Sequence, residues 1–203
     1  MSKNYTHIHV VLDRTGSMEV IRDDTIGGFN SFLKEQQDLP GKATMTLVQF
    51  DSLDPYEVVT DFKELGRVKK LNGQTYVPRA ATPLLDAIGR SINDVESKIS
   101  KMNDKPDGVI IAVITDGQEN SSLEFNLKQV KKMIKEKQEE KWQFAFLSAD
   151  LNSINDAIAM GIPQVATMAY GANSEGVSNM YSSVSASVAN YRKGKSDIVT
   201  FEE

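Results

Sequence analysis

Short runs of mostly apolar residues recur along the chain, separated by longer stretches in which apolar positions repeat with helical spacing. The runs at residues 8–12 and 109–115 are rich in β-branched side chains, which is typical of strands buried on both faces of a parallel sheet. Similar runs predict four further strands, the last of them at an edge, at residues 44–50, 57–62, 144–147 and 164–167.

The stretches between these runs predict five helices. The clearest covers residues 84–99, where apolar side chains recur at steps of three and four residues. Pro83 is expected in its first turn and Thr82 as its N-cap. An earlier helix at residues 18–39 contains adjacent glycines at 27 and 28, where we expect a kink. Apolar spacing predicts the remaining helices at residues 123–134, 154–160 and 177–191.

This alternation is typical of a doubly wound α/β fold, in which helices cover both faces of a mostly parallel, Rossmann-like sheet. The link at residues 51–55 is short and turn-like, so we expect one antiparallel edge strand after it. Residues 1–203 are predicted to form a single domain with a flexible tail at about residues 194–203. In such sheets ligands bind beyond the carboxyl ends of the strands, so a site is expected there.

Composition narrows the range of partners. The chain has 203 residues, 40% of them hydrophobic, a formal net charge of −5 and no basic patch, which argues against nucleic acid. It has no cysteine, which excludes disulfides, a thiolate nucleophile and cysteine-based metal sites. No apolar run reaches membrane-spanning length, and the first strand begins too early for a signal peptide. We therefore expect a cytoplasmic protein that binds neither nucleic acid nor membrane.

Oxygen-bearing side chains gather where predicted strands end and loops begin. Asp13, Thr15 and Ser17 follow the first strand, and because every second residue carries an oxygen, an extended loop presents all three on one side. Asp116 directly follows the apolar run at 109–115, and Thr82 lies just before a helix. Two carboxylates and three hydroxyls form the all-oxygen shell that a hard cation prefers. The sequence therefore predicts a Mg²⁺ site, with Mn²⁺ and Ca²⁺ as alternatives.

These residues resemble the metal-ion-dependent adhesion site of the von Willebrand factor A (vWA) domain family, whose pattern is Asp-x-Ser-x-Ser, a distant Thr and a distant Asp before Gly. Asp13, Ser17, Thr82 and Asp116 match this pattern, and Thr15 replaces a usual serine but keeps the hydroxyl. The resemblance covers nearly the whole chain, which looks like the compact stand-alone vWA proteins of bacteria and phages. It implies a protein-binding module, not an enzyme, in which an Asp or Glu of a protein partner completes the metal coordination.

Six further residues near the predicted site are candidates for partner contact. They are Arg14, Met18, Asp51, Glu119, Asn120 and Asp150. Several have a simpler interpretation: Met18 as the start of an apolar helix face, Asp51 as a turn former and Asp150 as a helix cap. Glu119 and Asn120, which follow Asp116 in the chain, could equally be solvated residues without a partner.

The two histidines, His7 and His9, lie two residues apart and therefore on one face of the first predicted strand. Such a pair could ligate a metal, but no third ligand lies nearby in the sequence. We expect them to pack under a helix or at a sheet edge.

Two other classes of function stay open on the residues alone. A Mg²⁺-dependent phosphoryl-transfer or hydrolytic enzyme would use Asp13, but the sequence has no glycine-rich phosphate loop and no convincing Ser-His-Asp set. A self-assembling structural protein would place an acidic residue of one copy, such as Glu202 or Glu203, in the metal site of another. The sequence does not predict the oligomeric state.

Overall fold

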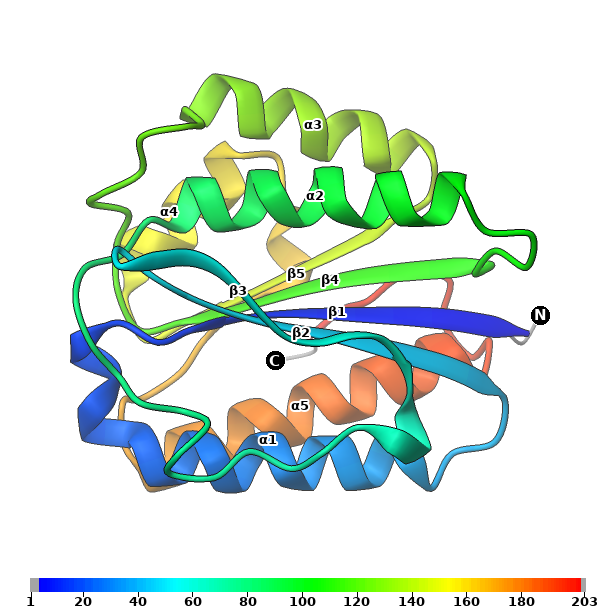
Figure 1. Ribbon diagram of the computed structural model, residues 1–203, viewed down its shortest axis with the longest axis horizontal. Helices are drawn as coiled ribbons and strands as arrows, with labels where there is room; N and C mark the ends of the chain where they lie inside the picture. Colours follow the sequence, from blue (N-terminus) through cyan, green and yellow to red (C-terminus); the bar gives the residue numbers. More distant parts are fainter. Residues whose placement is uncertain (1–3, 202–203) are drawn as a thin grey trace.

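The computed structural model describes residues 4–201, in which helices cover both faces of a six-stranded sheet (Figure 1). The strands are β1 (Tyr5–Asp13), β2 (Lys42–Asp51), β3 (Asp54–Glu64), β4 (Gly108–Thr115), β5 (Gln143–Ser148) and β6 (Thr167–Ala169). The α-helices are α1 (Arg22–Gln37), α2 (Leu84–Ser100), α3 (Leu127–Glu139), α4 (Leu151–Ala159) and α5 (Ser174–Arg192). Three short 3₁₀ helices are η1 (Gly16–Ile21), η2 (Leu65–Arg67) and η3 (Gln164–Ala166).

The order of strands in the sheet is β3-β2-β1-β4-β5-β6. All neighbouring strands run parallel except β2 and β3, which are antiparallel, so the predicted fold class and its antiparallel edge strand are confirmed. β1 pairs with β2 on one side and with β4 on the other, which makes the β1/β4 boundary the point where the strand order reverses. Ligand sites of doubly wound folds lie at such a point, beyond the carboxyl ends of the strands.

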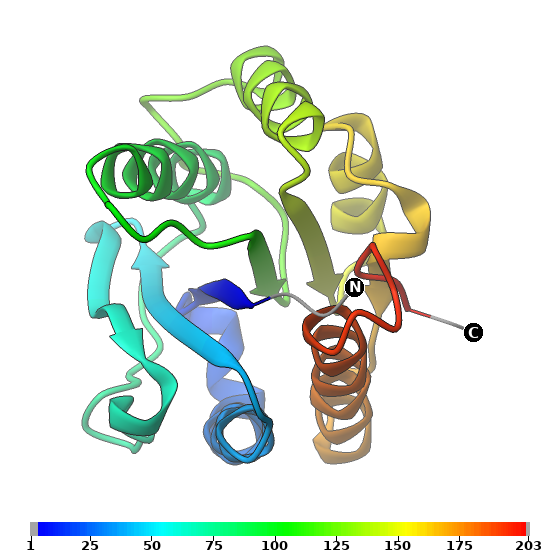
Figure 2. The same ribbon diagram turned by 90° about the vertical axis from the view of Figure 1, so that its right-hand side faces the viewer.

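Helices lie on both faces of the sheet (Figure 2), and an apolar core fills the space between sheet and helices on each face. One core joins the sheet to α1 and α5, and β1 contributes Ile8, Val10 and Leu12 to it. The other core joins the sheet to α2, α3 and α4, and Val11 points into it. This alternation follows from the two-residue period of a strand. Among the described residues, no helix is both long and apolar enough to cross a membrane.

The predicted helix at 84–99 is confirmed as α2, but its predicted cap is wrong. Pro83 occupies the N-cap position, and no side chain of the α2 cap accepts a hydrogen bond from the helix. Instead, the Glu119 carboxylate accepts the backbone N–H of Leu85 at 2.8 Å. The first turn of α2 is therefore completed by a residue from the loop after β4, which leaves Thr82 outside the helix.

Several other boundaries also differ from the prediction. The helix expected from residue 18 begins as the 3₁₀ helix η1, and α1 then continues through both glycines without a break. The helix expected from residue 123 begins at Leu127, because a capping box between Asn126 and Gln129 starts it there. Leu123, predicted on its inner face, is 97% exposed. The edge strand expected at 164–167 is shifted to β6, and the residues before it form η3.

The segment predicted to be a flexible tail contacts the rest of the domain in the part that the structure describes. Val199 is buried in the same core as α5, and its backbone N–H donates to the Gln143 side chain at 3.2 Å. The N–H of Phe201 donates to the carbonyl oxygen of Val165 at 2.7 Å. An apolar side chain in the core and paired backbone groups hold this segment against the domain. Glu202 and Glu203 lie outside the described residues.

Both histidines are buried on the face that α2 covers, in the middle of the sheet and not at its edge. The ring of His7 stacks on Phe62 of β3, with centroids 3.6 Å apart, and its Nδ1 contacts the Thr44 hydroxyl at 2.9 Å. Neither ring nitrogen of His9 has a hydrogen-bond partner within the described part of the chain. Packing under a helix is therefore confirmed for this pair.

Acid is expected to destabilise the protein through His9. Burial lowers the pKa of His9 to about 3, whereas an unfolded chain protonates histidine near pH 6.5. Because the folded pKa lies below the unfolded one, stability is lost as the pH falls from 6.5 towards 3, by about 1.4 kcal/mol per pH unit.

The variant His9→Leu removes this contribution. As the pH falls from 7.5 to 5.5, the wild type should lose about 1.4 kcal/mol more of its free energy of unfolding, measured in urea, than the variant does. Comparing the two proteins cancels the titration of their other groups. A difference that does not change with pH would contradict a neutral, buried His9.

Candidate metal centre

Asp13 ends β1 with its side chain buried between the carboxyl ends of β1 and β4. Its Oδ1 accepts the backbone N–H of Thr15 at 2.7 Å, which turns the chain directly after the strand. Its Oδ2 accepts the hydroxyl of Thr115, the last residue of β4, at 2.5 Å. One carboxylate therefore joins two neighbouring strand ends and fixes the loop that carries the next predicted ligands.

Asp116 brings the second carboxylate to the same place. Its Oδ1 accepts the hydroxyl of Ser17 at 2.7 Å, and the hydroxyl oxygens of Ser17 and Thr15 lie 3.3 Å apart. Four of the five predicted ligands, Asp13 included, therefore lie in one hydrogen-bonded group formed by two loops. That they ligate a metal stays a prediction.

Thr82 lies on a third loop that is attached to the other two. Its backbone N–H donates to Asn120 Oδ1 at 2.8 Å, and its carbonyl oxygen accepts the N–H of Asn120 at 3.1 Å. Two residues earlier, the carbonyl oxygen of Ala80 accepts the N–H of Gly16 at 3.1 Å. Ala80 has a φ of +60°, a left-handed conformation that costs a non-glycine residue about 1 kcal/mol. The surrounding contacts hold this strained turn and so position Thr82 beside the first loop.

The electrostatics of the group favour a cation. Burial, and to a smaller extent the nearby charge of Asp116, raise the pKa of Asp13 to about 7, against the hydrogen bonds from Thr115 and Thr15. Burial also raises the pKa of Asp116, against the hydrogen bond from Ser17. Two carboxylates that are both desolvated and close together repel each other, and a dication between them would remove that repulsion.

The donor set fits a hard divalent ion. Asp13 and Asp116 would supply charged oxygens, and Thr15, Ser17 and Thr82 neutral ones, as Mg²⁺ and Mn²⁺ accept. Within residues 4–201 there is no cluster of three or more His, Cys, Asp or Glu side chains that could hold a metal. Hydroxyl groups therefore have to complete this site, which distinguishes it from a histidine-rich or carboxylate-rich centre.

Two tyrosines that the sequence did not indicate bind the ends of the two strands that carry the site. The hydroxyl of Tyr76 donates to the main-chain oxygen of Asp13 at 2.7 Å, and that of Tyr170 to the main-chain oxygen of Thr115 at 2.8 Å. Both tyrosines are buried and come from connections far from these strands in sequence. They satisfy the last carbonyl groups of β1 and β4 and so hold the two strand ends in place.

Three of the six predicted partner contacts are too deeply buried for that role. Met18 is fully buried in the core under the sheet, which supports its alternative interpretation as part of an apolar face. Arg14 and Asp51 are also buried, and their side chains pair with each other, Nε to Oδ2 at 2.9 Å. Arg14 also pairs with Glu57, and Asp51 accepts the N–H of Leu53 in the β2–β3 turn. They brace the first loop against that turn instead of reaching a partner.

The other three lie nearer the surface. Asp150 is the N-cap of α4, where its Oδ1 accepts two backbone N–H groups, so the capping interpretation is confirmed. Its carboxylate also accepts the side-chain amide of Gln118 at 3.2 Å, which ties α4 to the loop of Asp116. Glu119 is half-buried as it completes the start of α2, whereas Asn120 is exposed. Among the six, Asn120 is therefore the most accessible to a partner.

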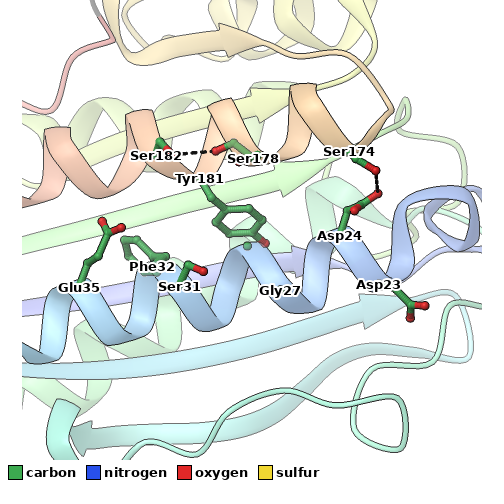
Figure 3. Close-up of a pocket in the computed structure, with 11 residues that line it drawn as sticks. Asp23, Asp24, Gly27, Ser31, Phe32, Glu35, Ser174, Ser178, Tyr181 and Ser182 are labelled. Atoms are coloured by element: carbon green, nitrogen blue, oxygen red, sulfur yellow. Dashed lines mark hydrogen bonds between the residues drawn. The ribbon is translucent and has the colours of Figure 1, made fainter.

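A separate hollow of about 420 Å³ lies between α1 and α5 (Figure 3). Acidic side chains and hydroxyls line it, and Asp24 accepts the hydroxyl of Ser174 at 2.8 Å. At its floor the ring of Tyr181 projects from α5 onto α1. None of the five predicted metal ligands lines this hollow, so it is distinct from the site at the strand ends.

Comparison with protein-family models and with curated proteins finds no match. Solved structures do match. One is proximal thread matrix protein 1 from the mussel byssus, with zinc in its metal-ion-dependent adhesion site (MIDAS) motif. It matches with 13% identity and a TM-score of 0.59, and the match covers 92% of this chain and 46% of that one. A von Willebrand factor type A protein from Catenulispora acidiphila matches with 12% identity, a TM-score of 0.62 and coverages of 92% and 43%. The pilus adhesin SpaC from Lactobacillus rhamnosus GG matches with 11% identity, a TM-score of 0.64 and coverages of 91% and 30%.

This chain therefore spans less than half the length of each of these three structures. At identities of 11–13%, the likeness establishes the fold alone.

Proposed function

Because the chain has the fold of von Willebrand factor A domains, we propose that it binds a divalent cation at the strand ends and captures an acidic side chain of a protein partner there. One observation carries the proposal. Asp13 and Asp116, on two different loops, are both desolvated, and they are joined through the backbone N–H and hydroxyl of Thr15 and the hydroxyl of Ser17. An arrangement of this kind is electrostatically unfavourable without a cation.

The proposed ligands would have two different roles toward the cation. Asp13 and Asp116 balance the charge of a dication, and the hydroxyls of Thr15, Ser17 and Thr82 fill neutral positions. A bound dication supplies the positive charge that attracts a further carboxylate. Because the hydroxyl ligands add no negative charge, they do not weaken that attraction.

The similar structures support this proposal at a coarser level. The mussel protein has zinc in its MIDAS motif, and SpaC is a pilus adhesin, so a bound divalent ion and a role in adhesion both occur among proteins with this fold. We favour Mg²⁺ as the natural ion because every proposed donor is a hard oxygen. We also propose that the module is not catalytic, since both histidines are buried in the sheet and offer Asp13 no general base.

Calorimetric titration of Mg²⁺ and Mn²⁺ into chelator-treated protein tests the metal site. We expect saturable binding by the wild type and none by Asp116→Ala, which loses one of the two charged donors. The matched control is Asp38→Ala. It removes an exposed carboxylate at the opposite end of the strands, where α1 leads into the start of β2. Binding that survives in Asp116→Ala, or is lost in Asp38→Ala, would contradict the proposed site.

A further inference from the structure

The four most exposed large apolar side chains of the described residues all lie around the strand ends that carry the candidate metal centre. They are Val20, Leu53, Leu123 and Leu151, with 82%, 73%, 97% and 69% of their surface exposed. Each belongs to a different connection: η1 after β1, the β2–β3 turn, the loop after β4 and the start of α4 after β5. In Figure 1 these four segments lie together at one end of the molecule. We call these four side chains the apolar rim.

Each member of the apolar rim is close in the chain to a group that contacts the metal-site loops. Val20 lies three residues after Ser17, in the same 3₁₀ helix. Leu151 follows Asp150, whose carboxylate accepts the side chain of Gln118, two residues beyond Asp116. The rim residues therefore come from connections that adjoin or contact the loops of the proposed metal site.

Buried carboxylates hold the backbone of two rim residues in fixed positions. Asp86, itself buried in α2, accepts the N–H of Leu123 at 2.9 Å through Oδ2 and the N–H groups of the next two residues through Oδ1. Asp51 accepts the N–H of Leu53 at 2.8 Å. The backbone of both leucines is therefore held in place while their side chains are exposed. A surface with this property is preformed for binding, because little conformational entropy is lost when a partner binds.

Scattered exposed apolar residues are ordinary on a protein surface, but this distribution is not scattered. The next most exposed, Val165 and Ile198, are 54% and 50% exposed, and together they line a hollow near the C-terminal segment with Trp142. Unlike these two, the four rim residues belong to connections at the carboxyl ends of the strands, where the candidate metal centre lies.

We propose that the apolar rim is the docking surface for a protein segment in which an Asp or Glu is flanked by large apolar side chains. This inference rests on the proposed function, since the carboxylate would complete the metal centre while its neighbours bury the rim. A single carboxylate is complementary in charge to the proposed dication, which favours this occupant. Acidic residues close to the rim residues in the chain, including Glu19, Glu119, Glu124 and Asp150, would repel an anionic membrane or a nucleic acid more strongly than a segment with one carboxylate.

A synthetic peptide library tests the inference in saturating Mn²⁺, with a central glutamate fixed and its flanking positions randomised. We expect selection of Leu, Ile, Phe or Trp at the flanks. Leu53→Ser and Leu123→Ser should each weaken binding of the selected peptide roughly three- to tenfold, as expected for the loss of one partly buried aliphatic side chain. The matched control is Val165→Ser with Ile198→Ser, which removes exposed apolar surface elsewhere and should leave affinity unchanged.

The outcomes separate this inference from the function on which it rests. Metal-dependent binding of glutamate peptides with no apolar preference, unaffected by the rim variants, would overturn the rim and keep the metal-dependent function. Apolar selection that persists in Asp13→Asn would support the rim and overturn the role of the metal. A library from which no peptide is selected would overturn both.

Discussion

Replacing Asp13 by asparagine is expected to abolish stabilisation by divalent cations without damaging the fold. At 100 times its dissociation constant, a cation that binds only the native state stabilises it by about 2.7 kcal/mol. For a domain of this size that corresponds to a rise in Tm of roughly 5–10 °C. Asp13→Asn loses the buried charge, so we expect no rise with Mg²⁺ or Mn²⁺.

The same variant should be at least as stable as the wild type in chelator. Asparagine keeps an oxygen to accept the N–H of Thr15, and its amide group can donate to the hydroxyl of Thr115. It also removes a desolvated charge beside Asp116, which we expect to raise the free energy of unfolding by roughly 1–3 kcal/mol at pH 8.

Differential scanning calorimetry of both proteins, with chelator and with each cation, measures both effects. A variant that is strongly destabilised in chelator would show that the carboxylate is structural and not a ligand. A full rise in Tm in the variant would place the cation elsewhere.

Gly28→Ala is expected to destabilise the protein by about 3 kcal/mol, the upper end of the range for overpacking a core. A Cβ at this position of α1 would lie 2.1 Å from Cδ2 of Tyr181 and within 3 Å of two further ring atoms. Tyr181 is buried, so removing this overlap requires its ring to rotate or α5 to move away from α1. The absence of a side chain at Gly28 therefore sets how closely the two helices pack.

Gly27→Ala is a matched control in the same helix. It has no atom within 4 Å of a Cβ, so alanine should stabilise the protein by roughly 0.5–1 kcal/mol through helix propensity. Urea unfolding of both variants gives the comparison. Equal effects at the two positions would show that the contact between Gly28 and Tyr181 does not limit the packing of α1 against α5.

The alternation of apolar runs and helical patterns was sufficient to predict the doubly wound fold. It was also sufficient to place Asp13 and Asp116 close together at the carboxyl ends of their strands, because neighbouring parallel strands end on the same side of a sheet. Local periodicity carries this information: a run of β-branched residues has few alternatives to a buried strand. The grouping of Asp13, Thr15 and Ser17 is likewise local, since one short loop carries all three.

Exposure and support around the site depended on distant parts of the chain. Met18 and Leu123 look alike in the sequence as apolar residues beside a loop, yet one is buried and the other 97% exposed. The difference is set by what packs above each residue, which adjacent sequence does not encode. The same holds for Tyr76 and Tyr170, which reach main-chain oxygens 63 and 55 residues away. The sequence by itself determined the fold and the chemistry of the strand ends. Only the tertiary structure decided which side chains surround them, because contacts between distant segments determine burial.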